Sequence, residues 1–149
     1  MNARQQTVST QELWARLFRA PTIDRFFADD GADALPSFAD YITELCRSRG
    51  EKPEQILRRS DVESSFGHRL FSGGRKPSRD TALQLAFGFG LTPQETQRLL
   101  LIAQASALHP KVKRDAVIAW CLSRGLPLTE AQQLLYDQSL PLLGGKHYE

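Results

Sequence analysis

The side chains whose types and spacing best suit chemistry belong to the segment 62–72. Apolar residues recur there every four positions, which is typical of a helix with one buried side. They are Val62, Phe66 and Leu70. The opposite side would expose two hydroxyls, an imidazole and a guanidinium, from Ser64, Ser65, His68 and Arg69. Such groups donate to and accept from base edges, and a guanidinium pairs bidentately with guanine.

The flanking residues predict the elements that would position this helix. Pro53 can open a preceding helix at its first position, where the missing N–H costs nothing. Ser60 and Asp61 would end that helix in a tight turn, and Gly73-Gly74 would stop the second one. Two short helices joined by such a turn are how a helix-turn-helix protein presents one helix to the major groove of DNA.

This stretch resembles the helix-turn-helix of the lambda-repressor-like (XRE) regulators. The run LFSGGRKPS at 70–78 is similar to that family's turn after the recognition helix. The resemblance implies an all-α fold, a lambda-repressor-like five-helix DNA-binding domain. Its first helix would span 38–50, and its fourth and fifth would span 78–89 and 92–105.

The region of about 10–140 also resembles a narrower group of small bacterial XRE-like regulators. The runs TIDRFF, KPSRD and GLTPQETQRLL carry this second resemblance. It implies an N-terminal helical arm with an acidic linker over 1–34, a DNA-binding domain over 35–106, and an added C-terminal helical hairpin over 107–149.

The family resemblance assigns roles to individual side chains. Ser64, Ser65 and Arg69 would contact bases, with Glu63 at the start of the helix. Four basic side chains would contact the DNA backbone, which positions a protein without specifying a sequence. They are Lys52, Arg75, Lys76 and Arg79.

Two positions depart from the family pattern. Leu57 stands where a small residue is usual, and Gly67 stands where a β-branched core residue is usual. We expect one compensating exchange, in which Leu57 fills the volume that Gly67 leaves, because packed cores tolerate exchanges that conserve volume. The alternative is that Gly67 only loosens its helix, by about 1 kcal/mol relative to Ala.

The charge distribution agrees with a DNA-facing segment. Residues 47–79 hold nine Lys and Arg against four Asp and Glu, a local charge of +5, whereas residues 1–46 carry −3. A duplex attracts such a basic patch through the release of its counterions.

An internal repeat with a period of 35 residues fills the C-terminal half. The segment 79–100 matches 114–135 at eight of 22 positions, and each copy reads as a helix, a glycine stop and a second helix. We expect the two copies to stack as in a short solenoid. Capping boxes are predicted at Thr92–Glu95 and Thr129–Gln132, with Asp80 and Asp115 in first turns.

Several apolar groups leave alternatives open. Leu13, Trp14, Leu17 and Phe18 form one stripe, and Ile23, Phe26 and Phe27 form another before the linker-like run 29–33. This arm would either fold back on its own domain, which we favour slightly, or dock on a second copy. Likewise the group Trp120, Leu134, Leu135 and Tyr136 would close the core or form a dimer surface. Residues 1–9 are expected to be disordered, and the tail 140–149 is expected to be frayed.

The remaining sequence features exclude most other classes. No apolar run approaches the roughly 20 residues of a membrane helix, and residues 1–11 lack the apolar segment of a signal peptide, so we expect a cytoplasmic protein. Cys46 and Cys121 are expected to be buried thiols. No cofactor, metal site or enzymatic activity is predicted, because no histidine has ligands at metal-binding spacing.

Two functions follow as hypotheses. The first is a sequence-specific transcriptional regulator that binds double-stranded DNA, as a dimer in the usual case. The second is a protein-interaction module, antitoxin-like or an accessory factor, that keeps the helix-turn-helix fold and binds a protein partner.

Overall fold

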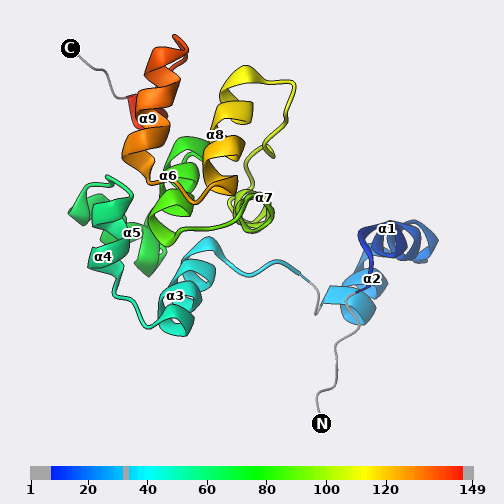
Figure 1. Ribbon diagram of the computed structural model, residues 1–149. Helices are drawn as coiled ribbons and strands as arrows, with labels where there is room; N and C mark the ends of the chain where they lie inside the picture. The colour runs from blue at the N-terminus through cyan, green and yellow to red at the C-terminus, as the bar shows by residue number, and fades with distance from the viewer. Residues whose placement is uncertain (1–7, 32–33, 146–149) are drawn as a thin grey trace. The chain divides into compact units, whose positions relative to one another are not determined.

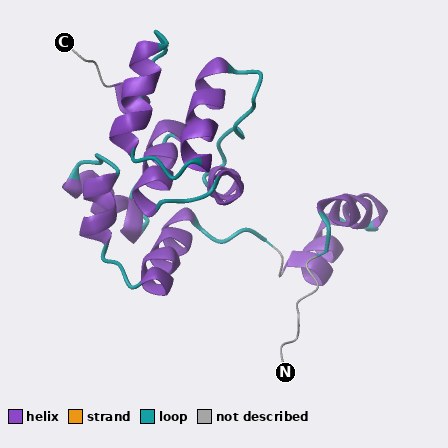
Figure 2. Ribbon diagram, viewed as in Figure 1, coloured by secondary structure: helices purple, strands orange, loops and turns teal. Residues whose placement is uncertain are grey.

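The chain consists of helices and connecting loops. The computed structural model describes residues 8–31 and 34–145, and all regular structure in those ranges is helical (Figures 1 and 2). The chain divides into two compact units, residues 1–35 and 36–149. No helix in the described ranges is long and apolar enough to cross a membrane.

The first unit is a pair of short helices, α1 (Thr10–Arg19) and α2 (Ile23–Asp30). Ser9 caps α1 by accepting a hydrogen bond from the Glu12 N–H at 3.1 Å. The expected linker begins later than predicted, because α2 continues through Asp30, whose carboxylate binds Arg16 at 2.9 Å. Disorder was predicted for residues 1–9, but Ser9 is the cap of α1; residues 1–7 and the linker residues 32–33 lie outside the described residues.

The second unit contains seven α-helices and one 3₁₀ turn among its described residues (Figure 1). They are α3 (Phe38–Arg49), α4 (Pro53–Arg59), α5 (Ser64–Ser72), α6 (Arg79–Phe89), α7 (Pro93–Ile102), α8 (Lys113–Ser123), α9 (Leu128–Asp137) and η2 (Leu143–Gly145). Helix α7 ends three residues before the expected Ala105, because Gln104 adopts a positive φ of 57° that a helix does not allow.

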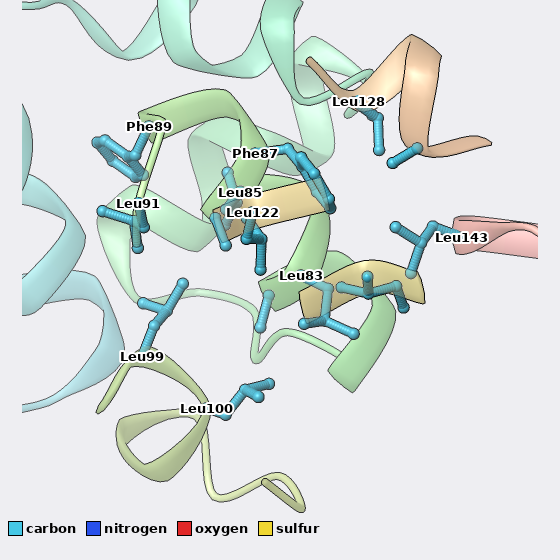
Figure 3. Close-up of a cluster of buried hydrophobic side chains, with 14 of the residues drawn as sticks. Leu83, Leu85, Phe87, Phe89, Leu91, Leu99, Leu100, Leu122, Leu128 and Leu143 are labelled. Carbon is cyan, nitrogen blue, oxygen red and sulfur yellow. The ribbon is translucent and has the colours of Figure 1, made fainter. Parts of the chain in front are cut away.

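The core is built around α6. All eight residues from Ala82 to Phe89 are buried, so this helix is covered on every side. Figure 3 shows Leu83, Leu85 and Phe87 among the leucines of the surrounding helices. Cys46 and Cys121 are buried free thiols, as predicted, and burial raises the pKa of both.

A glycine of α6 that the sequence analysis did not single out allows close packing on α4. A Cβ on Gly88 would lie 2.8 Å from the Ile56 carbonyl oxygen and 3.0 Å from the Ser60 Cβ. The Ser60 hydroxyl donates to that same carbonyl at 2.7 Å. Helix α6 therefore supports the end of α4 and the turn that leads into α5.

The two copies of the internal repeat exchange equivalent bonds. Arg79 binds both carboxylate oxygens of Asp115 at 3.0 and 2.9 Å, and Arg114 binds both oxygens of Asp80 at 2.9 Å. The loop N–H of His109 donates to Asp115, and the N–H of Gly144, 35 residues later, donates to Asp80.

A glutamine clamp is also repeated at the same period. The side-chain amide of Gln97 both donates to and accepts from the backbone of Leu108, and Gln132 does the same with Leu143. The bonds between the copies are reciprocal: the arginine of each copy binds the aspartate of the other. The two copies are therefore related by an approximate two-fold axis. The expected stacking as in a solenoid, which would repeat by translation, is therefore wrong.

Two smaller expectations about the C-terminal half are also wrong. Thr129 does not start a capping box, because α9 already begins at Leu128 and Gln132 faces Leu143 instead. The tail is not frayed at Leu143, whose side chain is fully buried. Residues 146–149 lie outside the described residues.

The apolar group of the C-terminal hairpin divides between core and surface. Leu135 is buried and closes the core, whereas Trp120 and Tyr136 are exposed. The Arg124 guanidinium lies 5.0 Å above the Trp120 ring, where a cation is attracted to the aromatic face. Core closure is therefore the role of Leu135 but not of these two aromatic residues.

Candidate nucleic-acid interface

Helix α5 starts two residues later than the apolar periodicity predicts, at Ser64 rather than Val62. The cause is Glu63, whose carboxylate accepts from the backbone N–H of Ser65 at 3.0 Å and of Phe66 at 2.7 Å. The Phe66 and Ser65 bonds, with the Arg69 charge, lower the pKa of Glu63 although partial desolvation opposes them. The carboxylate that would sit near a groove thus has a local role as a helix cap.

The contact of α5 with α4 depends on Gly67 and Leu57, the two residues that depart from the pattern of the family that this stretch resembles. Gly67 is buried, and a Cβ there would lie 2.9 Å from Leu57 Cγ and closer still to both methyl carbons. The expected exchange is confirmed, because Leu57 occupies the space that a side chain at Gly67 would need.

The opposite side of α5 carries the predicted base-contacting residues. Ser64, Ser65 and Arg69 are all exposed, while Leu70 is buried and Phe66 is half-buried against the core. Ser65 and Arg69 are four residues apart, so they lie on one face of the helix. Arg69 makes no side-chain hydrogen bond or ion pair with any described residue, so its five donors are available to a ligand.

His68 shares this exposed side but contacts the neighbouring helix. Its Nε2 lies 3.6 Å from a Glu54 carboxylate oxygen of α4. His68 is therefore tied to the scaffold more closely than Arg69.

A basic loop follows α5. The helix ends at Gly73 with a φ of 87°, and the N–H of Gly74 returns to the Arg69 carbonyl at 2.9 Å. Arg75 and Lys76 come next, both exposed and without an ion pair in the described ranges. Lys52, predicted for the same role, is exposed at the residue preceding α4. These side chains remain candidates for phosphate contacts.

Arg79 is placed differently from the other predicted phosphate ligands. Besides Asp115, its guanidinium donates to the carbonyls of Ser106 at 3.0 Å and Ala107 at 3.1 Å. The side chain is half-buried and its donors are directed into the protein. We therefore leave Arg79 out of the interface and assign it to the junction between the repeats.

Only some of the basic side chains between residues 47 and 79 could bind a ligand, because others are already bound to groups of the protein itself. Arg47 pairs with Glu44, Arg49 donates to the Phe89 carbonyl, and Arg59 donates to the Gly88 carbonyl. With Arg79, four of the nine cations are thus engaged within the protein. Five have no hydrogen bond or ion pair from their side chains in the described part of the chain. They are Lys52, Arg58, Arg69, Arg75 and Lys76.

A shallow hollow of about 540 Å³ lies beside the start of α5. Its lining comes from three segments far apart in the sequence, including Glu63 before α5, Ser78 before α6 and Gly144 of η2. Gln84 at its wall donates to the carbonyls of Ser60 and Asp61 and so holds the turn between α4 and α5. Within residues 8–31 and 34–145, no three His, Cys, Asp or Glu side chains are grouped to hold a metal ion.

Comparison with known proteins provides no relative for this chain. No family model, no curated protein and no solved structure matches it.

Proposed function

We propose that this chain is a sequence-specific DNA-binding transcriptional regulator of the lambda-repressor-like type, with α5 as the helix that enters the major groove. The main support is the exposed face of α5, which combines Ser64, Ser65 and Arg69 and leads directly into the basic loop. The Arg69 side chain has no hydrogen bond or ion pair with a described residue. Arg69 would supply specificity through guanine, and the two serines would meet a base edge or a phosphate.

The pattern of engaged and free cations supports this proposal. Arg49 and Arg59 are held by backbone carbonyls, while the side chains of Arg69, Arg75 and Lys76 have no hydrogen bond or ion pair with a described residue. These three cations lie on α5 and its following loop, where a duplex would release counterions, whereas Lys52 and Arg58 lie at α4.

A matched set of substitutions separates base reading from charge. Arg69→Ala should cost about 1–3 kcal/mol of specific binding and relax the preference at one base position. Lys76→Ala should weaken binding evenly across sequences and reduce the salt slope by about 1. Lys113→Ala, an exposed cation of α8, is the control and should leave both quantities unchanged.

The measurement is the affinity for a panel of duplexes at several salt concentrations. Equal effects of Arg69→Ala and Lys113→Ala on every duplex would contradict the proposal.

A second candidate function is protein interaction through exposed aromatic residues. Trp120 and Tyr136 on the C-terminal hairpin support it, since large aromatic side chains are enriched at interfaces. Under this candidate Trp120→Ala would abolish partner capture, and Arg69→Ala would have no effect.

A further inference from the structure

Helices α1 and α2, which we call the arm, carry an apolar surface with nothing buried beneath it. No residue of either helix is buried. Four large side chains are exposed: Trp14 by 54%, Phe18 by 76%, Ile23 by 54% and Phe27 by 61%. Aromatic surface of this extent marks an interaction site.

Each helix of the arm carries two of these four side chains on one side. The Trp14 and Phe18 rings, one turn apart on α1, stack with their centroids 5.5 Å apart. Ile23 and Phe27 are one turn apart on α2, and the Phe27 ring lies 6.0 Å from that of Phe26. Each helix of the arm therefore presents an apolar stripe.

The helices of the arm need a covering surface for their own stability. They have ten and eight residues, and isolated helices shorter than about 12–15 residues are marginal in water. Ser9 and Thr22 cap both helices well, but caps do not replace buried apolar area.

The arginines of α1 and α2 are paired with carboxylates of the same two helices. Arg16 binds Asp30 at 2.9 Å, Arg25 binds Asp29 at 3.0 Å and Arg19 binds Glu12 at 3.2 Å. Every arginine in the described part of the arm thus has a carboxylate partner. The surface offers no free cation to a phosphate or an anionic headgroup, so it suits a neutral apolar partner.

We propose that this partner is the arm of a second copy of the chain, in a symmetric dimer. An aromatic side chain buries about 150–250 Å², so the exposed parts of the four residues amount to about 500 Å² per arm. Two arms would bury about 1,000 Å², the lower limit of a specific interface. The dimer is therefore weak.

The repeat in the second unit favours the arm as the site of pairing. Isologous dimers need a self-complementary patch. The facing surfaces of α6 and α8 are self-complementary, but they already bind each other within one chain, because Arg79 and Arg114 bind the aspartates of the opposite copy. Within the described part of the arm itself, the exposed apolar side chains of α1 and α2 have no such partner.

The test uses the full chain with Trp120→Phe, so that Trp14 is the only tryptophan. Sedimentation and tryptophan emission are measured together, without DNA, from low to high protein concentration. We expect the mass to rise from monomer to dimer while the Trp14 emission shifts to the blue over the same range.

Two variants make the test specific. Phe18→Glu with Phe27→Glu should keep the chain monomeric with red-shifted emission at every concentration. Leu101→Glu, an equally exposed apolar residue of α7, should dimerise as the parent does. Far-UV circular dichroism checks that both variants keep the helices of the second unit.

Three results would overturn the proposal. The first is a monomer with solvent-exposed Trp14 at all concentrations. The second is a monomer whose emission is blue-shifted at every concentration, which would mean that the chain covers its own arm. The third is a blue shift only on addition of anionic lipid vesicles. The measurement contains no DNA, so none of these results bears on whether α5 reads the major groove.

Discussion

At the scale of single residues, Gly67 and Leu57 together decide how closely α5 approaches α4. The sequence predicted this pair because both residues depart from the family pattern in compensating directions. Gly88 has an equally close contact with α4, yet it escaped prediction. A glycine within a long apolar run has no sequence signal that tells which backbone lies against it.

Gly67→Ala should destabilise the protein by about 1–3 kcal/mol, because the new methyl group overlaps Leu57 in a packed core. Chemical denaturation measures the loss. In a Leu57→Ala background the same change should cost nothing, and would gain up to about 1 kcal/mol of helix propensity.

The double-mutant cycle is decisive for this contact. Additive effects of Gly67→Ala and Leu57→Ala would contradict the direct contact between the two residues.

At the scale of elements, the sequence predicted the positions of α3, α4 and α6 well, since each has a clear start and stop. Pro53, Ser78 and Gly90 mark such boundaries by local chemistry. The start of α5 was less predictable. A glutamate cap competes there with an apolar stripe that extends back to Val62, and the stripe alone does not show which one sets the boundary.

The arrangement of the repeat could not be predicted from its sequence. Matching residues at a constant period show that two copies exist, but translation and two-fold rotation give the same match. The aspartates of both copies were expected to serve the dipole of their own helix. Their additional partners, Arg79 and Arg114, lie in the opposite copy.

Asp115→Ala should destabilise the protein by about 3–5 kcal/mol, because it leaves the half-buried Arg79 without its carboxylate. The Asp115 side chain is only 5% exposed, against 28% for Asp80. We therefore expect Asp80→Ala to cost less. Thermal or urea unfolding of the two variants gives the comparison, and equal losses would mean that burial does not set the strength of the two pairs.

Stability should also depend on Asp80 at acidic pH. Burial raises the pKa of this carboxyl, but the hydrogen bonds from Arg114 and Gly144 and the nearby guanidinium charges outweigh it, so the pKa is lowered. A lowered pKa adds stability above the unfolded value of about 4, and this contribution disappears as the pH falls through the folded value.

The free energy of unfolding of Asp80→Asn should therefore fall less between neutral pH and about pH 2 than that of the parent. Asp40→Asn changes an exposed carboxylate without an ion pair in the described residues and serves as the control. A parallel decline in the parent and Asp80→Asn would contradict the assignment of the lowered pKa.

At the scale of the whole molecule, the structure shows that fewer basic side chains could contact DNA than the count of Lys and Arg in residues 47–79 indicates. The sequence predicted a basic segment of nine cations, whereas only five of these side chains have no hydrogen bond or ion pair with a described residue. Arg49 and Arg59 are engaged because folding brings the last carbonyls of α6 close to them, which the sequence does not show. Three of these five, Arg69, Arg75 and Lys76, lie on the helix and loop that the proposal places on DNA.

The central claim is that α5 reads a DNA sequence, and selection from random duplexes tests it most directly. The full-length protein is bound to a random-sequence pool at two salt concentrations, and the retained duplexes are sequenced. The proposal predicts that one motif is recovered at both concentrations and that affinity falls as salt rises. Recovery of no motif, with all binding lost at physiological salt, would contradict it.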